Sequence, residues 1–439
     1  MDPDRDLRPL ILFFLIVAII LFVGLFTPVR DRLQYHVDDW KSRLYYMKNK
    51  PEEQLFVPQE QIAASSTPTE APTETPEILL TDIPVIVTPE ATEVPTQTPE
   101  PTETPEPLPA SWNIEGVRYE DQHGIWNYCA PTNLSMAMTY WGWIGDRTSI
   151  GPKVKPFNKD KNVMFYELQE YVEEYSELRS VLRPGGTDEL LKRLLVNGFP
   201  VLVEKGSFMQ EVSGKLSWMG HYNVITGYDD EAEEWIVQDS YYTPNYKVSY
   251  EVFAEEWKGF NYQFMLVYPG SEEARVYEIL GPYTNGNWAN RNAMQTAERL
   301  IEEAQTTEEY FYAYFNRGTC QTALSDYYGA AQSYDMAFTY YADIETSRRP
   351  YRIVWYQTGP YTAYYYCGRY YDILSLAETT LASTAEPYLE ETHYWRAKAY
   401  EALGEIEKAR DDLNTCLELH KGFEACEQLL YDLGGPDEE

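Results

Sequence analysis

The sequence predicts an α+β domain over residues 110–270 followed by an all-helical domain over residues 273–439. In the first range, helical patterns precede a series of β-type segments, and this order is typical of α+β folds. In the second range, apolar residues keep a helical spacing and three segments align to one template. A chain of 439 residues is long enough for both domains and for further segments before them.

Composition and charge exclude some classes of protein. The formal net charge is −35, whereas a nucleic-acid-binding domain carries a basic surface, so we expect no nucleic-acid partner. The five cysteines are too few for a disulfide-stapled scaffold. No group of Cys and His residues has the spacing of metal ligands, so we expect neither a metal nor another cofactor.

The chain begins with a candidate membrane anchor, which we place in residues 1–27. Residues 9–26 are 18 uncharged, mostly apolar residues, just enough to cross a lipid bilayer once. A signal peptide is the competing interpretation, but no small-x-small cleavage site follows, so we expect an uncleaved anchor.

Two features disagree about which side of the membrane the domains occupy. Six Lys and Arg residues follow the span closely, between Arg30 and Lys50, and would place the rest of the chain in the cytoplasm. A Thr/Pro/Glu-rich stretch follows, and such stalks are typical of exported proteins. We expect a single-pass protein of the cell membrane with its C-terminal domains extracellular.

Two segments separate the anchor from the first domain. Residues 28–57 are predicted to form a juxtamembrane helix, since apolar residues recur at a 4-3-4-3 spacing; a short coiled coil and an amphipathic helix on lipid both fit. Residues 58–109 repeat phrases such as TPTEAPTETP, which predicts a disordered Thr/Pro/Glu-rich linker.

The first domain should contain three helices before its main β-rich region. The first begins at Cys129, and the other two span residues 164–176 and 187–198. Thr187 is the expected N-cap of the last helix, and Gly198 is expected to end it. The β-type segments are residues 178–184, 199–206, 221–230, 234–240, 245–253 and 262–270. We expect SWMG at 217–220 to be a flexible stretch before His221.

The second domain contains three related segments. Ser325, Gly368 and Gly404 fall at the same template position, at intervals of 43 and 36 residues, and Gly318, Tyr361 and Ala397 lie seven residues before them. The pattern resembles the tetratricopeptide repeat, a helix-turn-helix unit of about 34 residues. The longer interval predicts an insertion around residues 348–352. Such repeats imply a protein partner.

The chemistry of the first domain centres on Cys129. A cysteine in the first turn of a helix lies at the positive end of the helix dipole, which favours its thiolate form. Pro131 suits an early helical position, where its missing N–H would have no partner. Gln122 lies seven residues upstream, and its side-chain amide can donate to a developing oxyanion.

The base for such a nucleophile is best sought among the β-type segments. His221 begins one of them and Asp239 ends the next, 18 residues later. Two adjacent strands joined by the turn at 229–234 would bring these side chains together, and a carboxylate there orients the imidazole. The expected set is Cys129 as nucleophile, His221 as base, Asp239 as orienting group and Gln122 in the oxyanion hole.

The order Gln, Cys, His, Asp resembles the papain-like cysteine peptidases, and more closely the family related to bacteriocin-processing double-glycine peptidases. QHGIWNYCAPTN, GHYNVITGYDD and VQDSYY carry the resemblance. It implies a papain-like fold over residues 110–270 and hydrolysis of a peptide or protein substrate. Two alternatives stay open, a domain that has lost turnover and supports a binding repeat array, and a cell-wall amidase acting on peptide stems.

Other cysteines and histidines receive structural interpretations. Cys320, Cys367, Cys416 and Cys426 are expected to pack between helices. One disulfide among them would fit an exported protein, but the sequence does not give the pairing. His123, beside Gln122, is read as a cleft-lining or surface residue.

Overall fold

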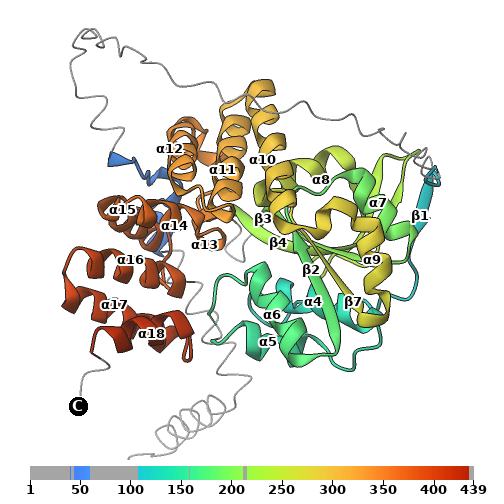
Figure 1. Ribbon diagram of the computed structural model, residues 1–439, viewed down its shortest axis with the longest axis horizontal. Helices are drawn as coiled ribbons and strands as arrows, with labels where there is room; N and C mark the ends of the chain where they lie inside the picture. The colour runs from blue at the N-terminus through green and yellow to red at the C-terminus, as the bar shows by residue number, and fades with distance from the viewer. Residues whose placement is uncertain (1–39, 41–43, 60–106, 158, 211–214, 435–439) are drawn as a thin grey trace, which may run out of the picture.

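The computed structural model describes residues 40, 44–59, 107–157, 159–210 and 215–434 (Figure 1). The expected anchor in residues 1–27 and most of the expected linker lie outside these ranges. Within the described ranges, no helix combines the length and apolar character needed to span a bilayer.

An antiparallel sheet whose strands differ in length forms the centre of the first domain. Its strands run in the order β2-β7-β3-β4-β5-β6, and β1 pairs with the far end of β4. The bounds are β1 (Ser111–Asn113), β2 (Leu178–Arg183), β3 (Val201–Gln210), β4 (Leu216–Asp229), β5 (Glu234–Gln238), β6 (Tyr246–Ser249) and β7 (Phe264–Pro269).

Helices cover both faces of this sheet (Figure 1). One core joins the sheet to α4 (Cys129–Tyr140), α5 (Arg147–Val154) and α6 (Phe165–Tyr175). The other joins it to α7 (Asp188–Val196), α8 (Tyr250–Trp257) and α9 (Glu273–Leu280). Strand side chains alternate between the faces, so Leu202 and Val224 enter the first core while Val203 and Ile225 enter the second.

The structure corrects two expectations in this domain. SWMG at 217–220 is not a flexible stretch but part of β4, paired residue by residue with the end of β3. The segment 245–253 is a strand only as far as Ser249, whose hydroxyl accepts from the Val252 N–H and caps α8. Residues 217–220 are a strand because they pair with β3, which is distant in sequence. The strand β6 ends at Ser249 because this residue caps the following helix.

The second domain consists of helical hairpins (Figure 1). A first helix, α10 (Gly286–Glu303), packs on α11, and a short α13 lies outside the hairpins. The remaining helices are α11 (Thr307–Ala323), α12 (Tyr327–Asp343), α13 (Ile353–Tyr356), α14 (Gly359–Tyr366), α15 (Tyr370–Ala382), α16 (Glu390–Ala402), α17 (Ile406–Leu419) and α18 (Glu424–Asp432).

The aligned template positions mark the hairpin turns. Ser325, Gly368 and Gly404 have φ of 63°, 71° and 76°, and each lies between the two helices of a hairpin. Left-handed backbone ends a helix and is least costly for glycine, which explains two of the three residue types. The predicted helix-turn-helix units are therefore present at the predicted positions.

The predicted insertion lies between α12 and α14 and contains α13. It packs against β4, so the two domains share one core rather than meeting through a linker. Trp218 of β4 and Phe260 stack with centroids 5.8 Å apart and join Phe311 of α11 in this shared core.

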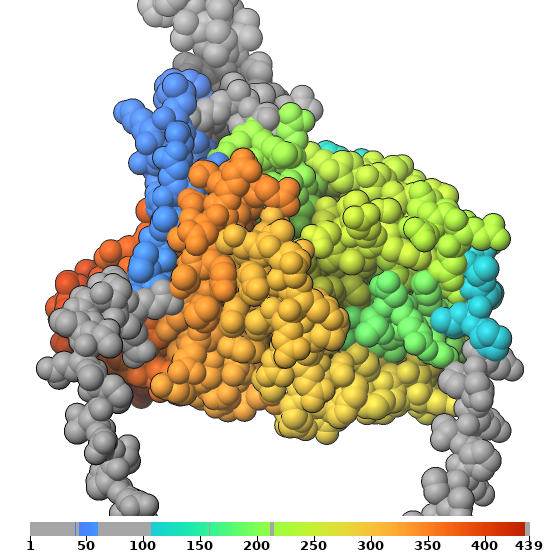
Figure 2. All heavy atoms as spheres, turned by 90° about the horizontal axis from the view of Figure 1, so that it is seen from above, coloured from blue at the N-terminus to red at the C-terminus, as the bar shows by residue number. Residues whose placement is uncertain are grey.

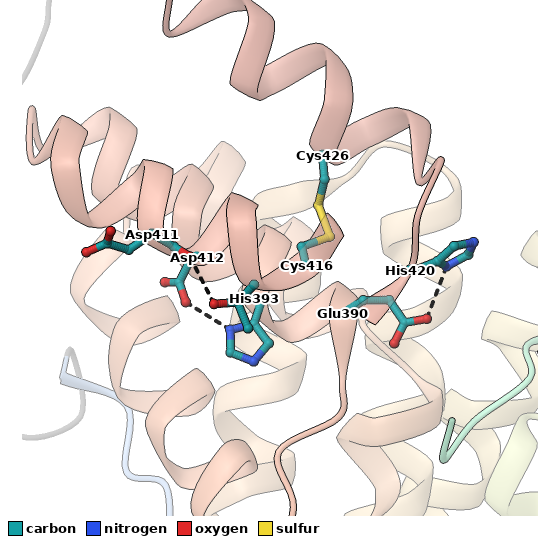
Figure 3. Close-up of a disulfide and its surroundings, with 8 residues drawn as sticks. Glu390, His393, Asp411, Asp412, Cys416, His420 and Cys426 are labelled. Carbon is teal, nitrogen blue, oxygen red and sulfur yellow. Dashed lines mark hydrogen bonds and ion pairs between the residues drawn. A yellow bond between two sulfur atoms is a disulfide. The ribbon is translucent and has the colours of Figure 1, made fainter. Parts of the chain in front are cut away.

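A disulfide between Cys416 and Cys426 joins α17 to α18 (Figure 3). Nearby, the His393 ring lies 2.9 Å from Asp412, which anchors α16 to α17. Cys320 and Cys367 are not part of a disulfide. The structure thus gives the pairing of the disulfide that the sequence allowed without assigning its two cysteines.

Residues 44–59 form a strap along the helical domain (Figure 2). The expected helix over 28–57 ends at residue 48 in the described part, because Lys50 is extended before Pro51. Phe56 is buried, 4.9 Å from Phe338 and 6.0 Å from Tyr364 between ring centroids. The strap is therefore part of the folded body.

The strap also makes polar contacts at its middle and at its C-terminal end. The Gln59 N–H donates to Asp372 Oδ1 at 2.7 Å, and the Glu52 carbonyl accepts from Arg349 Nη1 at 2.8 Å. Glu52 pairs in addition with Lys215, at the start of β4. The strap consequently contacts both domains.

We expect Phe56→Ala to destabilise the body by about 3 kcal/mol, because a buried phenyl ring is lost and a cavity remains. Urea denaturation measures the change, and limited proteolysis within residues 44–59 measures release of the strap. Val57→Ala, at a neighbouring exposed position, is the matched control. Equal stability of the two variants would contradict the anchoring role of Phe56.

Candidate active site

The candidate active site lies where β4 extends beyond its neighbour β5. β3 pairs with β4 from Leu216 to Ile225, but β5 pairs with it only from Val224 onward. The first half of β4 therefore has an edge that no strand of the described sheet covers. Helix α4 packs against β4, and the Tyr222 N–H of this strand helps to lower the pKa of the Cys129 thiol.

Local interactions hold Cys129 at the first position of α4. Tyr128 is the N-cap residue, and its ring packs so closely on Gly151 that a Cβ at that glycine would overlap the hydroxyl. One turn into the helix, the Asn133 amide donates to the Cys129 carbonyl at 2.9 Å. Cys129 therefore lies at the positive end of the helix dipole, as predicted.

Two cations hold the loop that precedes Cys129. The buried Lys155 ammonium donates to the carbonyls of Trp126, at 2.9 Å, and Asp160, at 3.2 Å. The Arg147 guanidinium donates to the carbonyls of Asp121 and His123. These contacts fix the path of the backbone from Gln122 to the nucleophile.

His221 and Asp239 form a buried pair beside Cys129. His221 Nε2 lies 2.9 Å from Asp239 Oδ1, and the two residues are 2% and 0% exposed. The same oxygen accepts from the N–H groups of Tyr241, at 2.9 Å, and Tyr242, at 3.1 Å. Because Nε2 is engaged, Nδ1 is the nitrogen left for the thiol, and the side chains of His221 and Cys129 are hydrogen-bonded.

The electrostatics favour a thiolate–imidazolium pair. Burial opposes ionisation of Cys129, but the hydrogen bond and charge of His221 outweigh it and hold the thiol pKa below its usual value. Burial likewise opposes protonation of His221, yet Asp239 and Cys129 raise the pKa of the imidazole to about 9. Burial also acts against ionisation of Asp239, whose pKa the His221 charge nevertheless keeps well below its ordinary range.

Gln122 is oriented by the residue after Asp239. Its backbone N–H donates to the Ser240 carbonyl at 2.9 Å, and its side-chain oxygen accepts from the Ser240 hydroxyl at 2.7 Å. The Asn133 amide donates to that hydroxyl at 2.8 Å. With its oxygen engaged, the Gln122 amide keeps its NH₂ group available as a donor.

The structure thus brings three predicted residues, Cys129, His221 and Asp239, into direct contact and ties Gln122 to them through Ser240. Their catalytic roles remain predictions. Sequence reasoning missed Ser240 and Asn133, although Asn133 lies four residues after Cys129, on the same helical face. It also missed the Tyr222 N–H, for which no sequence signal exists. His123 is exposed, and its ring lies 2.6 Å from Asp121.

Comparison with known proteins agrees with this geometry. Residues 114–265 match the sequence profile of the Peptidase_C39 like family. This likeness supports a cysteine-type peptidase domain in this region. No curated protein sequence matches the chain at a significant level.

One solved structure shows a weaker likeness. It is described as a C39-like peptidase from Bacillus anthracis, with 18% sequence identity and a TM-score of 0.29. The match covers 36% of this chain and 96% of the other. A likeness at this identity and TM-score supports no conclusion about activity.

We expect the Cys129 alkylation rate to reach its plateau well below the free-cysteine pKa of about 8.5. The His221 interaction lowers the thiol pKa, so His221→Ala should move the plateau to higher pH. Iodoacetamide labelling against pH measures both proteins. The same profile in both would mean that His221 does not activate the thiol.

We expect Asp239→Asn to move the alkaline limb of activity to lower pH. The His221 pKa of about 9 means that the imidazolium is lost as pH rises through that value. Because the charge of Asp239 is the main cause that raises this pKa, its removal shifts the limb downward. The measurement is the pH profile of kcat/KM.

Asp412→Asn is the matched control for this variant, because Asp412 pairs with His393 in the helical domain at the same 2.9 Å. It should leave the alkaline limb in place. A limb that stays near pH 9 in Asp239→Asn would exclude Asp239 as the group that sets the His221 pKa.

Proposed function

We propose that this protein is a membrane-anchored cysteine peptidase that hydrolyses peptide bonds of peptide or protein substrates. The observation that carries the proposal is the contact of Cys129, at a helix start, with the buried His221–Asp239 pair. The lowered thiol pKa and the raised imidazole pKa are those of an activated nucleophile and its base.

In the proposed reaction, the Cys129 thiolate attacks the substrate carbonyl carbon. The resulting oxyanion receives hydrogen bonds from the Gln122 NH₂ group and the Cys129 N–H. The His221 imidazolium gives its proton to the leaving amine as the carbon–nitrogen bond breaks. Neutral His221 then removes a proton from water, which hydrolyses the thioester and releases the acid.

We also propose that the body is held outside the cell by the span at residues 9–26 in the lipid bilayer. The uncharged run of 18 residues supports the anchor, and the Cys416–Cys426 disulfide supports an oxidising compartment. The helical hairpins support a protein partner or substrate recruited through tetratricopeptide-like repeats.

We expect Cys129→Ala to abolish peptide hydrolysis, because no other group in the site can form the thioester. Gln122→Ala should lower kcat by about 10²–10³-fold, the usual cost of one oxyanion donor. His123→Ala should retain activity, since that exposed ring is outside the proposed set. Hydrolysis of a peptide mixture and of peptidoglycan stem peptides, followed by mass spectrometry, measures all three.

Activity retained in Cys129→Ala would overturn the proposal. Absence of hydrolysis and ordinary thiol reactivity in the wild type would favour a domain without turnover. Cleavage confined to peptidoglycan stems would identify a cell-wall amidase with the same nucleophile.

A further inference from the structure

The first residues of the strap, drawn in blue in Figure 2, form a helical segment with two different faces. Residues 44–48 are helical. On the inner face, the Tyr45 hydroxyl donates to the Ala382 carbonyl at 2.8 Å, and the Lys215 ammonium lies 5.3 Å from the centroid of the Tyr46 ring. The inner face is therefore held to the body, at the end of α15 and just before β4.

The outer face presents large apolar side chains to solvent. Trp40, which is also helical, is 62% exposed, Leu44 is 41% exposed and Met47 is 78% exposed. Positions that are four and then three residues apart lie on one face of a helix, so these three side chains form a stripe, called the outer stripe below. A contiguous apolar surface of this kind marks a site of interaction.

The residues around the outer stripe are basic. Residues 40–50 contain four Lys and Arg residues and no Asp or Glu, although the whole chain has a formal net charge of −35. Among the four, Lys48 and Lys50 are exposed, and Lys50 pairs with Glu53 at 2.7 Å. An apolar helical face flanked by Lys and Arg is typical of segments that lie in the headgroup region of an anionic bilayer.

The chain before the outer stripe points to the same partner. Thirteen residues, 27–39, separate the uncharged run at 9–26 from Trp40. Thirteen residues reach at most about 45 Å when fully extended. With the uncharged run in a bilayer, as proposed above, the outer stripe is therefore always within this distance of a lipid surface.

A second copy of the chain is the competing occupant of the outer stripe. The 4-3-4-3 spacing that includes the stripe also fits the a and d positions of a coiled coil. In that register, Arg43 takes a g position and Lys48 the following e position. A parallel dimer places a g residue of one helix beside the following e residue of the other, so these like charges would repel each other. The same charges attract an anionic lipid surface, which favours the bilayer over a second copy.

We propose that the outer stripe lies on the anionic headgroup surface of the bilayer, as a second membrane contact beside the span at residues 9–26. The inference rests on the proposed membrane anchor. Because the inner face of the same helical segment is held to α15 and β4, this contact fixes the orientation of the body against the bilayer. His221 is six residues along the chain from Lys215, about 20 Å of strand, so the active site is kept near the membrane.

The test uses the full-length protein in lipid nanodiscs, made of phosphatidylcholine either alone or mixed with phosphatidylglycerol. Met47→Cys supplies a thiol on the outer stripe, and mass spectrometry follows its labelling by a water-soluble maleimide separately from that of the native cysteines. Tyr431→Cys, at a 75% exposed position of α18, is the matched control. In the anionic discs, labelling at position 47 should be slower than at position 431 by about 10-fold or more, because lipid covers the stripe.

Equal labelling at the two positions in anionic discs would overturn the proposal. A disulfide between two copies at position 47 after mild oxidation would also overturn it, because the occupant would then be a second copy. A protein that does not enter the discs would overturn the anchor at residues 9–26. Sedimentation of that protein with phosphatidylglycerol vesicles then tests the outer stripe alone, and failure to sediment would overturn this contact as well.

A charge reversal separates lipid binding from simple crowding at the disc. Lys48→Glu, added to the Met47→Cys protein, should speed labelling in anionic discs by about fivefold, since one basic contact with the headgroups becomes a repulsion. Lys421→Glu, at an exposed position distant in sequence, is the matched control and should leave the rate unchanged. The same rate in both variants would overturn the assignment of an anionic surface.

Discussion

The unequal length of β4 and β5 is the constraint on which the rest of the structure depends. An unpaired strand edge inside a folded body leaves backbone N–H groups that need partners. At this edge the Tyr222 N–H helps to lower the pKa of the Cys129 thiol, and the Tyr356 ring packs over Gly220. The same edge therefore stabilises the nucleophile as a thiolate and fixes where the helical domain can pack.

The buried charges of the site are tolerable only as a connected set. An isolated imidazolium inside the protein would lose its proton, because desolvation favours the neutral form. Asp239 reverses this for His221, and two backbone N–H groups in turn stabilise Asp239. His221 then lowers the thiol pKa, so that the removal of one member alters the protonation of the others.

Sequence patterns anticipated the parts of the fold that depend on local chemistry. The turn residues Ser325, Gly368 and Gly404 located the helical hairpins, because a helix reversal of this kind needs left-handed backbone. The long interval between the first two located the insertion. Nothing local showed that 217–220 would be a strand, since its partner is the end of β3 and the pairing is tertiary.

By itself, the sequence determined which residues could do the chemistry: a cysteine at a helix start, a histidine and an aspartate on consecutive strands, and an upstream glutamine. Residue type and local spacing suffice for that. Only the tertiary structure decided that Ser240 orients Gln122, that the strap containing Phe56 is bound to the body, and that Tyr356 packs over Gly220 of β4. Each of these contacts joins residues more than 100 positions apart or lies across a domain boundary, where spacing along the chain carries no information.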